Sequence, residues 1–439
     1  MHFYDFNWYG KEEAKKEAET KTEKAFRYVQ EESLDTESTE NMFIEGDSLD
    51  ALKILQESHV GKIKMIYIDP PYNTGKKFIY NDNFRYSKRE WKFITGRDCN
   101  GRLHVKWLNM MYPRLKLARN LLRDDGVIFI SIDDHEVANL RKVCDEIFGE
   151  ENFIANIIWQ RAFSPKNDAK YFSNSHDHLL IYSKNIATFI PGRLDRSLEQ
   201  DRRYTNPDND PRGPWISGDL SVRRYSEKSN YPIETPSGRK VYPTHGSCWR
   251  ISKEKFNELE IDGRIWFGLD GSSVPRLKRF LSEVREGIVP VTLWLSKEVG
   301  HNQEAHQELK QLFDGKAYFD APKPLRFLKK ILKVSNTIRE DVILDFFAGS
   351  SSTAHAVIDL NKEDRGNRKF IMVQLPEPCN EKSEAYKAGY ENIAELGKAR
   401  IRRVAKKIKE EKPEYQGDLG FKVFKIENPS DNDVSEDMR

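Results

Sequence analysis

An apolar segment, residues 63–68, runs directly into Asp69-Pro70-Pro71-Tyr72, and this junction limits the possible folds more than any other part of the chain. A short apolar run of this kind is typical of a buried strand. The two prolines fix φ and remove two backbone donors, so the chain must leave the strand in a stiff, extended turn. The Asp69 carboxylate and the Pro70 carbonyl can accept hydrogen bonds there, and the Tyr72 ring can stack. The junction predicts a rigid binding turn; the alternative is a proline turn that only ends the strand.

A second strand and turn lies far downstream, where Val342–Asp345 is followed by small residues and then by a helix from Ser352. In an open α/β sheet such a turn lets the backbone approach a nucleoside-bearing cofactor at the carboxyl end of the strand. It is not a phosphate cradle, because no Gly-Lys pair in the chain is followed by Ser or Thr, as a Walker A loop requires. This segment alone also fits an ordinary strand-to-helix turn.

The two segments, in this order, resemble the amino-group DNA methyltransferases of the beta order. In that family a catalytic Asp-Pro-Pro-Tyr precedes the D-x-F-x-G-x-G loop that binds S-adenosyl-L-methionine (AdoMet), and the target-recognition region lies between them. The whole chain looks most like the modification (Mod) subunits of type III restriction–modification systems. The supporting segments are Ile44–Leu49, Trp107–Leu122, Gly126–Asp134, Asp145–Glu150, Pro322–Pro324 and Arg368–Ile371.

This sequence departs from the family pattern in two respects. Ser351 stands at the second glycine of the AdoMet motif; a small residue still fits, but the loop can follow a slightly different path around the methionine end. The chain also stops soon after Gly420–Phe424, where larger members of the family carry a further C-terminal region.

The resemblance implies a set of site residues. The catalytic ones are Asp69, Pro70, Pro71 and Tyr72. Those expected to bind the cofactor are Asp47, Lys323, Pro324, Asp345, Phe347, Gly349, Ser351 and Glu377. Among them, Glu377 is the candidate for the ribose, because a carboxylate beyond the second strand usually holds its hydroxyls. The candidates for DNA contacts come instead from basic clusters in the segment between the two motifs, and they are Arg223, Arg224, Arg276 and Lys278.

The expected architecture is a Rossmann-like α/β sheet with helices on both faces, interrupted by an inserted domain. Periodic strand and helix patterns fade after Arg161 and return near residue 321, and prolines and glycines recur between them. The expected divisions are a charged helical arm at 1–40, a catalytic half at 41–184, a target-recognition domain at 185–320, an AdoMet-binding half at 321–427 and a polar tail at 428–439.

Composition excludes several classes of protein. No apolar stretch approaches the roughly 20 residues of a membrane span, and the N-terminus is acidic where a signal peptide would be basic and then apolar. A cytoplasmic location is therefore expected. Cys99, Cys144, Cys248 and Cys379 lack CxxC spacing, which argues against zinc knuckles and a disulfide framework. His176 and His178 could be metal ligands, but the expected reaction needs no metal.

These observations predict an AdoMet-dependent enzyme that methylates the N6 amino group of adenine in double-stranded DNA after base flipping. Asp before Pro-Pro favours adenine, since amino-cytosine enzymes more often carry Ser there. An N4-cytosine enzyme is the first alternative, and a DNA-binding specificity subunit with weak or lost methylation is the second. A helicase–nuclease restriction subunit is a possible partner and a homodimer is expected; any ATP-driven cleavage would come from another chain.

Overall fold

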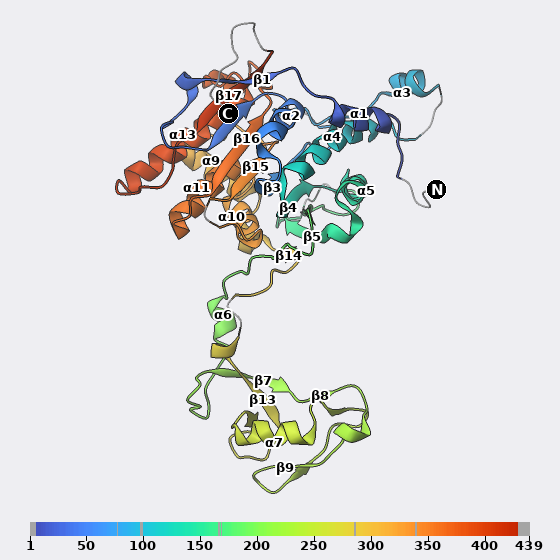
Figure 1. Ribbon diagram of the computed structural model, residues 1–439, viewed down its shortest axis with the longest axis vertical. Coiled ribbons are helices and arrows are strands. Elements are labelled where there is room, and N and C mark those ends of the chain that lie inside the picture. Colours follow the sequence, from blue (N-terminus) through green and yellow to red (C-terminus); the bar gives the residue numbers. More distant parts are fainter. Residues whose placement is uncertain are drawn as a thin grey trace. The chain divides into compact units, whose positions relative to one another are not determined.

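The computed structural model describes residues 6–428 except 77, 97–99, 166, 168, 285–286 and 339. The chain forms two compact units, Met1–Gly192 with Pro290–Arg439, and Arg193–Val289 (Figure 1). Most of the tail expected at 428–439, and Cys99, lie outside the described residues. Cys144, Cys248 and Cys379 are buried free thiols. No helix among the described residues is both long and apolar enough to cross a membrane.

The first unit is built on a ten-stranded sheet (Figure 1). All neighbouring pairs from β17 to β4 are parallel, whereas β6 is antiparallel to both of its neighbours and β1 is antiparallel to β17. This sheet confirms the expected Rossmann-like α/β class. In spatial order the strands are β1 (Ala25–Tyr28), β17 (Lys422–Glu427), β2 (Met42–Glu45), β16 (Lys369–Gln374), β15 (Val342–Asp345), β3 (Ile63–Ile68), β4 (Leu122–Ile132), β6 (His176–Ser183), β5 (Phe153–Gln160) and β14 (Leu293–Trp294).

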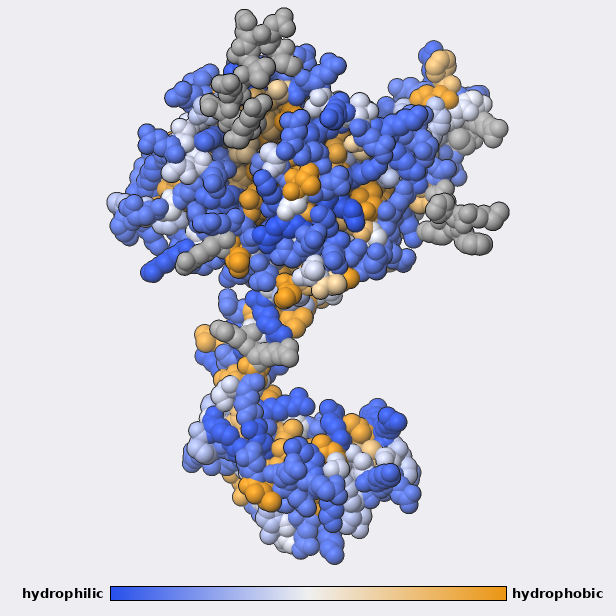
Figure 2. Space-filling view, viewed as in Figure 1, coloured by the Kyte–Doolittle hydropathy of each residue, from blue (hydrophilic) through white to orange (hydrophobic). Residues whose placement is uncertain are grey.

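The central strands are apolar because helices cover both of their faces. Every residue of β3 and β16 is buried, as expected for parallel strands packed on two sides. Ile66, Leu344 and Ile371, from three adjacent strands, belong to one core cluster. Figure 2 shows mostly hydrophilic residues on the visible face of each unit, with hydrophobic residues in small separate groups.

Two groups of helices flank the sheet. One group packs α2 on α4 and α4 on α5, and the other packs α10 on α11 and α11 on α13. Crossovers between parallel strands are right-handed, and the chain moves in opposite directions through the sheet at α4 and at α11, so the groups cover opposite faces. The helices of this unit are α1 (Lys11–Glu19), α2 (Ser48–His59), α3 (Lys88–Thr95), α4 (Val105–Leu121), α5 (Val137–Phe148), α8 (Ser296–Val299), α9 (Asn302–Leu312), α10 (Leu325–Val334), α11 (Ser352–Asp364), α12 (Glu384–Lys387) and α13 (Ile393–Glu411).

The N-terminal arm is more than the isolated charged helix that the sequence predicts. After α1 the arm continues into β1, which pairs with β17 and extends the sheet. In the segment after the Asp-Pro-Pro-Tyr turn, α3 begins at a capping box in which Ser87 and Glu90 satisfy each other's backbone N–H groups. Trp91 on this helix is buried.

The second unit has its own core. β7 (Trp215–Asp219), β13 (Arg276–Phe280) and β12 (Ile265–Trp266) form an antiparallel sheet. Trp249, Phe256 and Ile265 belong to a separate apolar cluster. The smaller elements are α6 (Leu198–Asp201), β8 (Ser221–Val222), β9 (Ile233–Glu234), β10 (Lys240–Val241), β11 (Cys248–Trp249) and α7 (Lys253–Ile261).

The inserted unit is shorter than the segment 185–320 assigned to it from the sequence. It begins at Arg193 and ends at Val289, and an antiparallel bridge between Leu194 and Ile288 joins its two ends. The residues after it return to the first unit, where β14 pairs with β5. The bounds differ because strand pairing decides which unit a segment joins, whereas the sequence analysis assigned the segment by its composition.

Candidate functional site

The site lies where the strand order of the sheet reverses, between β15 and β3. From β15 the chain crosses to β16 on one side, whereas from β3 it crosses to β4 on the other. Helices therefore leave in opposite directions and open a crevice at the carboxyl ends of these strands. Leu344 pairs with Ile66, so Asp345, the last residue of β15, and Asp69, the first residue after β3, lie at the same edge of the sheet.

A pocket occupies this crevice and brings together residues predicted from both halves of the chain. Asp69 and Pro71 line it from one side, and Lys323, Asp345 and Glu377 from the other. The remaining lining residues are Tyr67, Tyr80, Phe319, Ala321, Pro322, Phe347, Ala348, Gly349, Ser350, Ser352, Thr353, Gln374 and Ile393.

The Asp-Pro-Pro-Tyr turn is held by side chains around it. The Tyr72 hydroxyl donates to Asp69 Oδ1 at 2.8 Å, and burial raises the pKa of Tyr72 well above its usual value, which keeps that hydroxyl protonated. Lys323 Nζ forms an ion pair with Asp69 Oδ2. The indole N–H of the fully buried Trp107 donates to the Pro71 carbonyl at 2.7 Å. Within the turn, Pro70 is buried.

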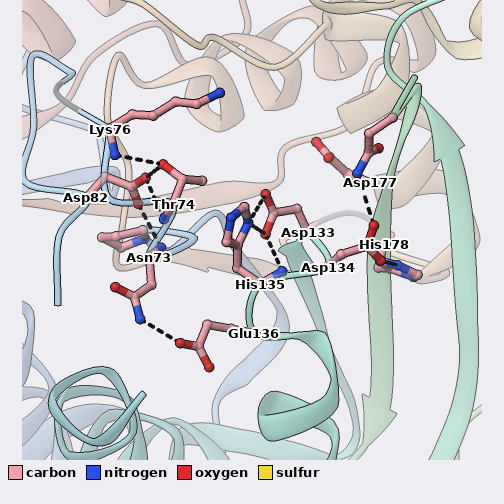
Figure 3. Close-up of polar contacts among 12 residues, drawn as sticks. Asn73, Thr74, Lys76, Asp82, Asp133, Asp134, His135, Glu136, Asp177 and His178 are labelled. Atoms are coloured by element: carbon pink, nitrogen blue, oxygen red, sulfur yellow. Dashed lines mark hydrogen bonds and ion pairs between the residues drawn. The ribbon is translucent and has the colours of Figure 1, made fainter. Parts of the chain in front are cut away.

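The residue after the turn fixes its exit. Asn73 is buried and has a φ of 61°, in the left-handed region that Asn tolerates better than most residues. Its side-chain amide donates to Glu136 Oε1 at 2.6 Å, and its backbone N–H donates to Asp82 Oδ1 at 2.9 Å. Figure 3 shows these contacts, and Asp82 also accepts from the backbone N–H of Thr74. Asn73 therefore ties the end of the turn to Asp82 and to Glu136, which precedes α5.

The loop after β15 is arranged around a buried carboxyl group. Asp345 accepts hydrogen bonds from Thr353 Oγ1 at 2.6 Å and from the Phe347 backbone N–H at 3.1 Å. Complete burial nevertheless raises the pKa of Asp345 to about 7. The Gly349 N–H donates to Gln374 Oε1 at 2.6 Å. Gly349 has a φ of 53°, and a Cβ there would lie 3.0 Å from the Phe319 ring, so this position requires glycine.

Ser351, at the position where the family motif has its second glycine, adopts a left-handed conformation with a φ of 58° and a ψ of 37°. Non-glycine residues pay about 1–2 kcal/mol for that conformation, which gives a backbone reason for glycine at this position. The Ser351 hydroxyl is buried and forms no hydrogen bond. Ser351 is not among the residues that line the pocket, although Ser350 and Ser352 are.

The other expected cofactor residues lie in different places. Glu377 is on the pocket wall, where Oε1 accepts from the Asn81 N–H at 3.0 Å, and burial raises its pKa. Asp47 is not among the lining residues. It caps α2 by accepting from the Leu49 N–H at 2.8 Å, and it pairs with Arg114 at 2.8 Å. Pro324 precedes α10 and is also absent from the pocket wall.

Sequence reasoning missed several residues of the site. Tyr80 and Phe319 stack at the pocket with ring centroids 5.9 Å apart. Asp177, next to the two histidines, is 5% exposed and lies 2.7 Å from Arg161 Nε, and burial raises its pKa to about 6. Its place between the two histidines was the available signal, whereas nothing in the sequence pointed to Phe319.

His176, His178 and Asp134 lie close enough together, with ligand atoms within 4.8 Å of one another, to hold a metal ion. The existing contacts already account for this arrangement, since His178 Nε2 lies 3.0 Å from Asp134 Oδ1 (Figure 3). His178 Nδ1 also contacts the Asn156 side chain.

The candidate DNA-contacting residues of the second unit differ in exposure. Arg223 and Arg224 are exposed. Arg276 pairs with Asp219 at 3.0 Å. Lys278 is 6% exposed, and its ammonium forms ion pairs with Asp210, at 2.9 Å, and with Asp208. In this structure Lys278 therefore joins β13 to the preceding loop and has no free face for a phosphate.

Residues 63–379 match a family model described as DNA methylase. The chain belongs to this family, which confirms the resemblance drawn from its motifs. It is 37% identical to the type III restriction-modification enzyme StyLTI Mod subunit of Salmonella typhimurium, over 97% of this chain and 67% of that protein. It is 32% identical to the EcoPI Mod subunit of Escherichia phage P1, over 96% and 71% of the two chains. The type II methyltransferase M.KpnI of Klebsiella pneumoniae is 33% identical over 84% of this chain and 88% of its own.

We expect Ser351→Gly to stabilise the protein by about 1 kcal/mol, because glycine adopts the left-handed conformation without strain and removes the unpaired hydroxyl. Greater freedom of the unfolded chain offsets part of this gain. Ser351→Ala is the matched comparison, since it removes the hydroxyl but keeps the strained backbone, and it should gain less. Urea denaturation measures both; a destabilised Ser351→Gly would show that the hydroxyl makes a favourable contact.

We expect Asp345→Asn to reduce the loss of stability as the pH rises. The folded state holds the proton on Asp345 up to about pH 7, whereas the ordinary value of 3.8 applies after unfolding. The stability contributed by this raised pKa is complete below pH 3.8 and is lost as the pH passes 7. The free energy of unfolding at pH 5 minus that at pH 8 should be smaller in the variant by at least about 1 kcal/mol. Identical pH profiles would contradict this environment.

Proposed function

We propose that this protein is an AdoMet-dependent DNA methyltransferase that modifies the N6 amino group of adenine in double-stranded DNA, as the modification subunit of a type III-like restriction–modification system. The observation that carries the proposal is the meeting of Asp69 and Asp345 in one pocket at the point where the strand order reverses. Membership of the DNA methylase family and the similarity to two type III Mod subunits support it.

The turn is suited to activating an aromatic amino group. Such a nitrogen shares its lone pair with the ring and is a poor nucleophile. Hydrogen bonds from its N–H groups to the Asp69 carboxylate and the Pro70 carbonyl would localise that lone pair on nitrogen. The Tyr72 ring would stack on a base turned out of the duplex, which must be held by its edge and its face. Catalysis would then consist mainly of positioning and electrostatic stabilisation.

The pocket residues fit AdoMet as the cofactor. Gly349 leaves room that a Cβ would fill, next to Phe319, and Glu377 on the wall offers a carboxylate to ribose hydroxyls. Phe347 and Asp345 would complete the enclosure, with Lys323 at the methionine end. When bound, AdoMet supplies a methyl group on a positively charged sulfur.

The second unit would recognise the DNA sequence. This unit has its own core. Exposed residues such as Arg223 and Arg224 can therefore be substituted without disturbing the packing of the catalytic sheet. As a Mod subunit the protein would act in the cytoplasm, associate with a helicase–nuclease restriction subunit and form a homodimer.

We expect Asp69→Ala to abolish methyl transfer while the affinity for DNA stays within about tenfold of the wild type, because the carboxylate acts mainly on the transition state. Assays with tritiated AdoMet measure the turnover, and mass spectrometry of the digested DNA identifies the methylated base. Substantial turnover in the variant would remove Asp69 from the mechanism. If the methylated base is N4-methylcytosine, the protein is an N4-cytosine methyltransferase and not an adenine enzyme.

We expect replacement of Arg223 and Arg224 by Ala to weaken DNA binding and to lower its dependence on salt by about one unit of slope per lost phosphate contact. AdoMet affinity should not change, since the pocket belongs to the first unit. Lys278→Ala provides the contrast, because loss of its buried ion pairs should lower the stability of the second unit. Unchanged binding and salt slope in the double variant would place recognition elsewhere.

A further inference from the structure

Lys323 forms an ion pair with the Asp69 carboxylate, which the proposed reaction needs as a hydrogen-bond acceptor. Its ammonium forms an ion pair with Asp69 Oδ2, and the exposed fractions of the two side chains are 8% and 23%. The other oxygen, Oδ1, already accepts the hydroxyl hydrogen of Tyr72. Both oxygens of Asp69 are therefore engaged, and the strongest acceptor of the turn is neutralised.

The same lysine lies between the two halves of the pocket. It belongs to the segment before α10, which lines the pocket together with Asp345, whereas its partner Asp69 follows β3. Its positive charge also acts on the carboxyl groups of Asp177 and Asp345, where it opposes the rise in pKa caused by burial. The ammonium lies 5.5 Å from the centroid of the Tyr72 ring. Lys323 thus faces carboxylates from both the catalytic and the cofactor side.

An ammonium on Asp69 opposes the proposed reaction in two ways. It competes with the amino group of the target base for the carboxylate, and it adds a positive charge where a positively charged cofactor must bind. In a partly buried site both effects are stronger than in water. A carboxylate brought in by the cofactor would give the lysine a second partner and release the first.

We propose that Lys323 is a positioning residue that links cofactor binding to capture of the target base. Without cofactor it neutralises Asp69; when the pocket is filled it pairs with the carboxylate of the methionine portion, and Asp69 becomes free to accept the target amino group. This role rests on the proposed function. The two binding events must then be coupled, and each strengthens the other by the same factor.

The test measures base capture rather than turnover. A duplex that contains the methylation site of the wild-type enzyme, with 2-aminopurine next to the target adenine, reports extrusion of that adenine by its fluorescence and leaves the N6 amino group in place. S-adenosylhomocysteine keeps the amino-acid carboxylate of AdoMet but has lost the methyl group. In the wild type we expect it to increase the affinity for this duplex at least about fivefold. Methylthioadenosine, which lacks the methionine portion, should give no increase.

Three variants locate the effect. In Lys323→Met the duplex should bind equally well with and without S-adenosylhomocysteine, and Lys323→Arg should restore part of the coupling. Lys316→Met is the control, because this lysine is exposed, pairs with Glu384 and lies outside the pocket wall; it should keep the wild-type ratio. Melting curves verify that each variant folds.

Several outcomes would overturn the role of Lys323. They are an undiminished ratio in a folded Lys323→Met, an equal effect of methylthioadenosine, or no coupling in the wild type. The methylthioadenosine measurement needs no variant and decides the matter even if Lys323→Met fails to fold. If the wild type methylates DNA but shows no coupling, only the role of Lys323 falls. If it does not methylate DNA, the proposed function falls with it.

Discussion

The pairing of β3 with β15 is the interaction on which the rest of the structure depends. These strands are separated by more than half of the chain, yet they are neighbours in the sheet, with Ile66 opposite Leu344. Their pairing creates the reversal of strand order, and with it the crevice. Without it Asp69 and Asp345 would belong to separate halves, and the pocket would lose one of its walls.

Much of this arrangement was readable from the sequence, because buried parallel strands leave a strong signal. The expected strand at 63–68 coincides with β3, and the expected strand at Val342–Asp345 coincides with β15. Helix starts were readable where a side chain caps the backbone, as Asp47 does for α2. The capping box at Ser87 carried the same kind of signal for α3.

The partners of charged side chains could not be read in this way. An ion pair such as Lys323 with Asp69 joins residues whose contact depends on the packing of the entire sheet. For the same reason, Lys278 looked like a surface cation but is buried between two carboxylates. Sequence patterns report burial and periodicity, which are local, whereas charge pairing depends on which distant segments meet.

The order of the strands has a consequence for the synthesis of the protein. β2 and β3 follow each other in the chain, but β16 and β15 stand between them in the sheet. While the ribosome makes the inserted unit and the segments after it, both edges of β2 and one edge of β3 have no neighbour. Unpaired edges invite association between chains. The nascent polypeptide therefore has to keep them apart until its last third emerges, which makes completion of the sheet a late event in folding.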